Sequence, residues 1–362
     1  MKHRLLLTLA LLGSLTATAQ ITQKLTATKA NDYALVYTLP KTAIDVTIVA
    51  KKTVETPGEF YQFSKRLLNV DNPISAESTA WTIEDVIINT HGVPDNDERY
   101  TVKFSAGSAP FMLLSPDNVP LAVNTEQQYA APSQEIPKAE RATATPLETP
   151  AARQVMTEDM LRATTPLRRA QSAAEQLYAL RQSRQELLTG QAEQMPPDGQ
   201  AMQLVLDNLN AQEAALTAMF LGTTKTSTQV VTYTFIPPSD TTRVDGYVLA
   251  RLSQVDGLVE ADNLSGAPII LDYRVTAKGE MPKNEKGVEL ALPKNGFAYC
   301  IPGKATVQID YDGRELADRT LTVAQAGVIY GLAPNSFTDK KAPVYLIFDP
   351  TTGAAVEIGS KQ

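Results

Sequence analysis

The pattern of apolar and polar residues divides the chain into a β-like part, a helical part and a second β-like part. In "AIDVTIVA" (43–50), Ile44, Val46 and Ile48 alternate with more polar residues, as in a half-buried strand. Residues 59–70 instead have the three- and four-residue spacing of a helix. Further β-prone segments are "YALVYTL" (33–39), "STAWTIEDVIINT" (78–90), "RYTVKFSA" (99–106) and "FMLLSPDNVPLAV" (111–123). We therefore predict an N-terminal α+β domain over residues 20–128, mainly antiparallel.

The stretch "LLTGQAEQMPPDGQAM" (187–202) has the residues of a turn between two helices. Thr165 suits the N-cap of the first helix, and Gly190 suits its left-handed C-terminal cap. Asp198 can cap the second helix, which Gly222 ends. The sequence thus predicts an antiparallel helical hairpin over residues 164–222.

Each helix of the predicted hairpin carries an apolar stripe, and the two stripes can bury each other along a common seam. We expect Leu177 and Leu209 to be seam residues and Asp198 to be structural as the cap. The stripe residues are Leu167, Ala170, Ala174, Leu177 and Leu188 on the first helix, and Met202, Val205, Leu209, Leu216 and Met219 on the second.

The C-terminal part has the clearest strand pattern, and residues 223–362 are predicted to form a β-sandwich-like domain. Asp312-Gly313 suits a tight hairpin, and "DPTTG" (349–353) suits another turn. The strand segments are "VVTYTFI" (230–236), "GYVLARL" (246–252), "IILDYRV" (269–275), "ATVQIDY" (305–311), "RTLTVAQ" (319–325) and "VYLIFD" (344–349).

Residues 129–163 are rich in Pro, Ala and Thr, which favours a solvated linker with a short helix near "TEDMLRA" (157–163). The predicted fold class is therefore α+β, mostly antiparallel β, with two β-rich domains separated by a long α-helical hairpin.

The N-terminus predicts export. Lys2 and Arg4 precede an apolar run, and Ala17-Thr18-Ala19 fits a signal-peptide cleavage site that makes Gln20 the first mature residue. No later apolar stretch approaches the length of a membrane-spanning helix. The expected location is the periplasm or the outer membrane. The formal net charge is −7 at pH 7, which disfavours nucleic acid as a partner.

Five segments carry a resemblance to a known family: "GEFYQFSKRLL" (58–68), "AAEQLYALRQSRQELLTGQAEQMPPDG" (173–199), "RLSQVDGLVEADNLSGAPI" (251–269), "AYCIPGKATV" (298–307) and "AQAGVIYGLAP" (324–334). In these the chain resembles DUF4831, a family of exported proteins of Gram-negative anaerobes. The Pro, Ala and Thr stretch at 129–163 departs from the family pattern and looks expanded. The resemblance implies an envelope location, but it brings no activity and no functional residues.

Candidate chemistry is sparse. After removal of His3 with the signal peptide, His91 is the one histidine left, and Cys300 is the one cysteine. The sequence therefore holds no set of His and Cys ligands for a zinc site and predicts no cofactor. We interpret His91 as a turn or core-edge residue rather than a base, and Cys300 as buried and inert.

Two acidic loops are weak calcium candidates. One offers Asp95, Asp97 and Glu98, and the other offers Asp256, Glu260 and Asp262. Neither has the glycine and distal glutamate of an EF-hand loop, so solvated turns are the favoured interpretation. Arg181 and Arg184 are similarly interpreted as ion-pair partners along the helical seam rather than as an anion site.

These observations favour a non-catalytic envelope protein with a binding, assembly or scaffolding role, whose partner is an envelope protein or a glycan. The first alternative is a carboxylate-based, glycan-active hydrolase on a β scaffold. The second is a periplasmic adaptor with an α-hairpin. A deep pocket with two facing carboxylates favours the hydrolase, whereas an exposed apolar strip on the hairpin favours assembly. The sequence leaves the oligomeric state open.

Overall fold

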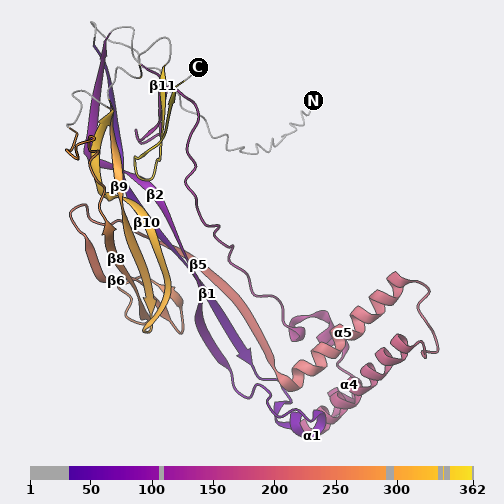
Figure 1. Cartoon of the computed structure of the whole chain (residues 1–362). Coiled ribbons are helices and arrows are strands. Elements are labelled where there is room, and N and C mark those ends of the chain that lie inside the picture. Colours follow the sequence, from indigo (N-terminus) through magenta and orange to yellow (C-terminus); the bar gives the residue numbers. More distant parts are fainter. Residues whose placement is uncertain (1–31, 106–109, 291–296, 333–336, 338–342, 361–362) are drawn as a thin grey trace, which may run out of the picture.

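A computed structural model describes residues 32–105, 110–290, 297–332, 337 and 343–360. The predicted signal peptide (1–19) lies outside the described residues. The described chain forms an elongated β body, and a pair of long helices projects from one end of it (Figure 1). The fold is α+β, and its strands are mostly antiparallel, as the sequence predicts.

The spine of the molecule is a three-stranded sheet in the order β2-β1-β5. β1 (Asp32–Thr56) and β2 (Ser78–Ser105) form a long antiparallel hairpin, and β5 (Thr223–Phe235) pairs with the second half of β1. β-Branched residues fill much of β1, and its alternation puts Ile44, Val46 and Ile48 on the buried face. β1 ends at Thr56, immediately before Pro57-Gly58.

A second, five-stranded sheet has the order β10-β9-β8-β6-β7. It consists of β6 (Arg243–Ser253), β7 (Gly257–Val259), β8 (Ala267–Ala277), β9 (Phe297–Tyr311) and β10 (Arg314–Leu332). The turn between β9 and β10 has Asp312 at φ 52° and Gly313 at φ 71°, and a two-residue hairpin turn of this twist requires positive φ at both positions. The predicted turn is thus confirmed.

The two sheets share one hydrophobic core and form the two layers of a sandwich. Ile44, Val46 and Ile48 of β1 pack with residues of the second sheet such as Leu271 and Val307, and all five are fully buried. The three-stranded layer therefore contains strands from both sides of the helical insertion, and the five-stranded layer lies wholly on its C-terminal side.

A third sheet, in the order β12-β11-β4-β3, closes the other end of the body. It contains β3 (Met112–Leu114), β4 (Pro120–Val123), β11 (Val344–Phe348) and β12 (Ala355–Ser360). Its core residues pack around Tyr37 of β1 and Phe297 of β9. The Tyr37 hydroxyl donates to the Ala298 carbonyl oxygen (3.1 Å) and accepts from the Ala298 backbone N–H (2.6 Å), and burial raises its pKa above the ordinary tyrosine range.

The predicted division into an N-terminal domain (20–128) and a C-terminal sandwich (223–362) is not confirmed. β1 pairs with β5, for example Ile48 with Val231, and both β cores contain residues from the two segments. Backbone pairing and core packing therefore join the segments in one body, and no boundary between two separate cores runs through it.

The helices are α1 (Ser64–Leu68), α2 (Pro150–Gln154), α3 (Glu158–Arg162), α4 (Pro166–Thr189) and α5 (Gly199–Leu221), with 3₁₀ turns η1 (Tyr61–Phe63) and η2 (Pro146–Glu148). α4 and α5 lie side by side and are joined at the far end, so we call them the helical pair (Figure 1). The short helix predicted near 157–163 is α3.

The predicted caps of the helical pair are all present. The Thr165 and Asp198 side chains accept backbone N–H groups of α4 and α5, at 3.3 Å and 2.7 Å. Gly190 ends α4 in the left-handed region at φ 71°, and Gly222 ends α5 at φ 86°.

Residues 129–141 run along the outer face of the three-stranded sheet (Figure 1). The Asn89 side-chain amide bonds both the N–H and the C=O of Gln134, at 2.7 Å and 2.9 Å. Thr228 also bonds both backbone groups of Glu140: its hydroxyl oxygen accepts from the Glu140 N–H (2.6 Å), and its own N–H donates to the Glu140 carbonyl oxygen (2.9 Å). The first part of the predicted solvated linker (129–163) is thus an exposed strap that is tied to β2 and β5. The prediction is wrong for the second part, which forms η2, α2 and α3 and buries Val155 and Met160 completely.

Candidate docking surface

The base of the helical pair is fixed to the β body by the C-terminal end of α5. The last carbonyl groups of a helix have no partner within the helix. Here the loop between β1 and β2 supplies three: Phe60 N–H donates to Met219 O (2.7 Å), Ser64 Oγ to Phe220 O (2.8 Å), and Ile74 N–H to Leu221 O (2.9 Å). The helix then continues directly into β5.

A compact apolar core surrounds these contacts. It combines Phe60 from the β1–β2 loop, Met160 from α3, Leu177 from α4 and Phe220 from α5, all almost fully buried. Because four separate segments meet in this core, the helical pair projects as a fixed arm and not as a tethered appendage.

The core ends about halfway along the pair. There Glu213 forms ion pairs with Arg181 and Arg184, both at 2.7 Å, and Arg184 also donates to Asn210 at 3.1 Å. These contacts confirm the predicted pairing of the two arginines across the seam. Farther from the β body than these contacts, Leu187 is the single buried residue among the described residues of the helical pair.

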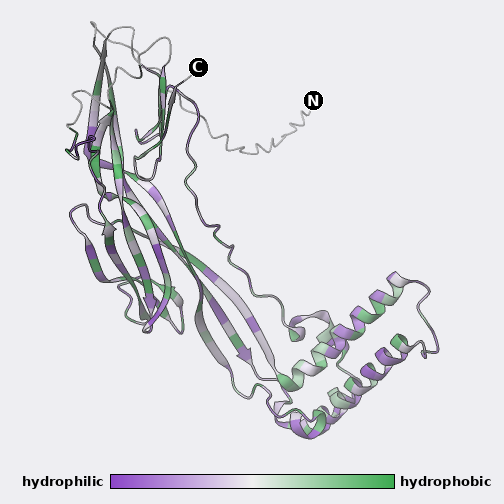
Figure 2. Cartoon of the chain, in the orientation of Figure 1, coloured by the Kyte–Doolittle hydropathy of each residue, from purple (hydrophilic) through white to green (hydrophobic). Residues whose placement is uncertain are grey.

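We define residues 185–212 as the distal end of the helical pair. Half of its large apolar side chains are exposed: Leu188 is 62% exposed and Leu204 65%, with Met195 at 46% and Val205 at 37%. Figure 2 shows hydrophobic residues along both helices up to this end.

The predicted seam is therefore correct at the base, and at the distal end it is wrong for Leu188 and Val205. Leu177, Leu216 and Met219 are buried as expected, whereas Leu209 is only half-buried and Leu188 and Val205 face solvent. A stripe along two helices stays buried only while the helices remain close or a third element covers them, and the base alone has such elements.

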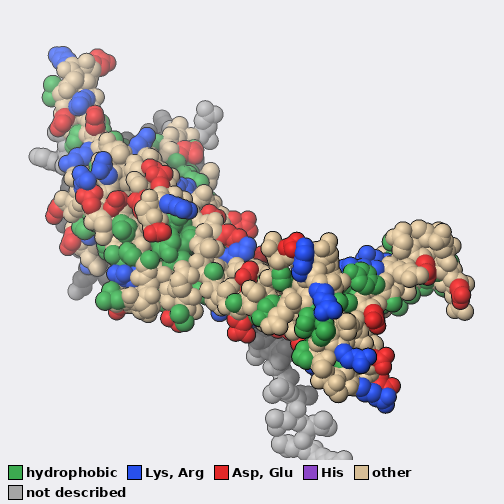
Figure 3. All heavy atoms as spheres, turned by 90° about the horizontal axis from the view of Figure 1, so that it is seen from below, with side chains coloured by type: hydrophobic (Ala, Val, Ile, Leu, Met, Phe, Trp, Pro, Cys, Tyr) green, Lys and Arg blue, Asp and Glu red, His purple; other side chains and the backbone are tan. Residues whose placement is uncertain are grey.

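The distal end is acidic as well as apolar. It contains Glu186, Glu193, Asp198 and Asp207 and no Lys or Arg. In Figure 3 the far end of the arm shows acidic side chains, whereas Lys and Arg lie nearer the body. None of the four carboxylates forms an ion pair with a described residue.

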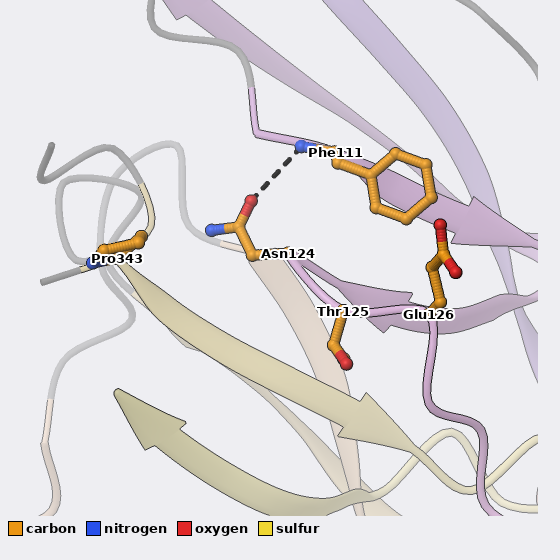
Figure 4. Close-up of a pocket in the computed structure, with 5 residues that line it drawn as sticks. All are labelled: Phe111, Asn124, Thr125, Glu126 and Pro343. Atoms are coloured by element: carbon orange, nitrogen blue, oxygen red, sulfur yellow. Dashed lines mark hydrogen bonds between the residues drawn. The ribbon is translucent and has the colours of Figure 1, made fainter. Parts of the chain in front are cut away.

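A shallow hollow of about 550 Å³ lies where the third sheet meets the body, lined by Phe111, Asn124, Thr125, Glu126 and Pro343 (Figure 4). The Asn124 amide is already used, because it accepts from the Phe111 N–H (3.2 Å) and donates to two carbonyl oxygens. The polar side chains left to line the hollow are one hydroxyl and one carboxylate. This set does not provide the two facing carboxylates that the hydrolase alternative requires.

His91 lies in a polar row across the three-stranded sheet. Its Nδ1 is 2.5 Å from Asp45 Oδ2, and the other oxygen of Asp45 accepts from the Thr234 hydroxyl at 2.6 Å. The row brings a histidine and a carboxylate together, which the sequence does not predict. The Thr234 hydroxyl donates to the carboxylate and not to the imidazole, so the order of groups is not that of a nucleophile activated by histidine.

The first calcium candidate is occupied by a lysine. Lys41 Nζ lies 2.9 Å from Asp95 and 3.9 Å from Asp97, and the hydrogen bond to Asp95 raises the pKa of Lys41. The Glu98 carboxylate accepts from the Tyr100 hydroxyl. An ammonium group thus already lies between two of the three carboxylates that a calcium ion would need.

The second calcium candidate is an ordinary polar turn. The backbone N–H of Asp256 donates to Ser253 Oγ (3.2 Å), and the backbone N–H of Asn263 donates to the Glu260 carbonyl oxygen (3.1 Å). Throughout the described part of the chain, no three His, Cys, Asp or Glu side chains gather as metal ligands. Asp262 and its neighbours are therefore not brought together in one site.

Cys300 is buried at 2% exposure, and its thiol lies 3.7 Å from the Ala324 carbonyl oxygen. Burial raises its pKa to about 12, so the group is a neutral thiol at physiological pH. This is the environment of a core residue and not of a nucleophile.

Comparisons with known proteins place the chain in a family. A family model described as a domain of unknown function, DUF4831, matches residues 33–356. No curated protein and no solved structure matches the chain. None of the helices in the described residues has the length and apolar character needed to cross a membrane. Because the family model covers nearly all of the described fold, the chain belongs to the DUF4831 family.

Proposed function

We propose that this protein is a non-catalytic, exported envelope protein that binds a protein partner through the distal end of its helical pair. The observation that carries the proposal is the exposure of four large apolar side chains, Leu188, Met195, Leu204 and Val205, at the end of a fixed arm. Exposed apolar clusters rimmed by polar residues are typical of protein interaction sites. The export pattern at residues 1–19 supports a location in the periplasm or at the outer membrane as part of the proposal.

A protein partner suits this surface better than a glycan. The exposed apolar side chains of the distal end are aliphatic or thioether chains, which bury well against other apolar side chains. The fixed base matters equally, because an arm that is already ordered loses little conformational entropy when a partner binds.

A truncation of the arm tests the proposal. Residues 185–209 are replaced by a four-residue Gly/Ser linker, which leaves every buried residue of the base core in place. The full-length and truncated proteins are then used for affinity isolation from the native envelope. We expect the truncated protein to stay folded by circular dichroism and to lose the partner. Recovery of the same partner by both proteins contradicts the proposal.

A point-variant pair provides the matched control. Leu188→Gln with Leu204→Gln removes apolar surface from the distal end, whereas Val255→Gln with Leu264→Gln removes it from loops of the β body. All four side chains are at least 62% exposed, so neither pair should alter folding. The first pair should lose the partner, and the second pair should retain it.

A further inference from the structure

The two ends of the helical pair differ in their unpaired charges. At the base, Arg66, Arg153 and Arg168 are exposed and form no ion pair with any described residue, and the exposed acids without an ion pair there are Glu77, Asp159 and Glu175. The distal end has four acids and no base. The arm is thus strongly negative at its tip, whereas its root carries free arginines beside a similar number of free acids.

Exposed apolar residues also occur at both ends. Leu161 at the base is 67% exposed, and Tyr178 is 49% exposed although its hydroxyl donates to the Leu67 carbonyl oxygen at 2.9 Å. A second arm could therefore bury apolar side chains at both ends of the pair.

The dimensions of the arm favour complete overlap. α4 has 24 residues and α5 has 23, so each is about 35 Å long. Two adjacent helices of that length present a face of about 700 Å², close to the roughly 800 Å² per partner of a standard interface. The distal end alone offers only about half as much area.

We propose that the helical pair binds the helical pair of a second copy in antiparallel orientation, forming a four-helix bundle about a two-fold axis. Each acidic tip then lies on the arginine-bearing base of the other copy, and the same contact occurs twice. A parallel arrangement would place eight tip carboxylates together, so charge selects the antiparallel orientation. This inference rests on the proposed function and identifies the partner as a second copy of the chain.

A charge-swap experiment tests the inference on the full mature chain. The tip variant is Glu193→Lys with Asp207→Lys, and the base variant is Arg66→Glu with Arg168→Glu. All four side chains are exposed and none belongs to the base core, so circular dichroism should show native folds. Sedimentation equilibrium over a range of concentrations then measures association of each protein and of an equimolar mixture.

The wild-type protein should sediment as a dimer. The dissociation constant of each variant's dimer should be at least about tenfold higher than that of the wild-type dimer. The reason is that the swapped side chains meet like charges at both contacts. The mixture should regain dimers. One contact then joins a lysine tip to a glutamate base, and the other joins an unchanged acidic tip to an unchanged arginine base. Leu188→Gln with Leu204→Gln should weaken association in the same assay.

A monomeric wild-type protein overturns the inference, as does a dimer that neither charge variant weakens. A mixture that stays monomeric while each variant is folded also overturns it, because the antiparallel contacts are then not the ones formed. The proposed function fails independently, through recovery of the same envelope partner by the truncated arm. A monomer whose partner is lost on truncation therefore refutes the second copy and leaves the docking arm standing.

Discussion

Two leucines on facing helices show how differently the base and the distal end of the arm are packed. Leu177 of α4 is fully buried among Phe60, Leu216 and their neighbours in the base core. Leu209 of α5 likewise belongs to the apolar stripe of its helix, but it is only half-buried. The contribution of each leucine to the free energy of unfolding depends on how many atoms surround its side chain and not on its position in the apolar stripe.

Leu177→Ala should reduce the free energy of unfolding by about 2–5 kcal/mol, because it leaves a cavity in a closed core. Leu209→Ala should cost only about 0.5–1.5 kcal/mol, since part of the side chain is already in water. Urea unfolding followed by circular dichroism measures both. Equal costs for the two variants would show that the distal seam is as tightly packed as the base.

The loop between β1 and β2 is the element that joins the arm to the body. Its backbone passes so close to α5 that a Cβ atom on Gly58 would lie 2.4 Å from the Met219 carbonyl oxygen and 2.6 Å from that of Ala218. Backbone oxygens cannot turn aside as a flexible side chain can, so glycine is required there. The close approach also brings Phe60 N–H within reach of Met219 O.

Gly58→Ala should therefore destabilise the protein by about 1–3 kcal/mol by forcing the loop away from α5. Gly199→Ala is the control, because its Cβ would meet nothing within 4 Å and its φ is not positive. That change should be neutral or stabilising by about 0.4–1 kcal/mol. Thermal melts of both variants make the comparison, and a neutral Gly58→Ala would mean that the loop has room to shift.

At the scale of the whole molecule, the chain leaves the β body, builds the arm and returns to complete the same body. β5 follows directly after α5 and pairs with β1, whose register with it runs from Ile44 with Phe235 to Thr56 with Thr223. The sandwich core needs both segments, because its three-stranded layer combines β1 and β2 with β5, and its five-stranded layer follows the insertion. The β body is therefore expected to fold as one cooperative unit.

Neither residues 20–128 nor residues 223–362 should fold when expressed alone. The first segment would lack the five-stranded sheet, and the second would expose the core face of that sheet, including Leu271 and Val307. Circular dichroism melts and limited proteolysis of both fragments provide the measurement. A cooperative melt of the isolated 223–362 fragment would restore the two-domain interpretation.

Local features of this protein were readable in the sequence because they depend on neighbouring residues. The cap residues Thr165, Asp198 and Gly190 and the turn at Asp312-Gly313 act within a few positions of themselves. The alternation in β1 likewise predicts which of its faces is buried.

Tertiary structure alone decided which strands pair and which parts of an apolar stripe are covered. β1 and β5 are separated in sequence by the whole arm. Backbone hydrogen bonds between strands do not depend on residue type, so the sequence pattern does not identify which distant strand pairs with β1. Leu188 and Leu177 belong to the same stripe, but only the base has α3 and the β1–β2 loop packed over it. The exposed end of the arm, and with it the proposed site, follows from that difference in what lies nearby.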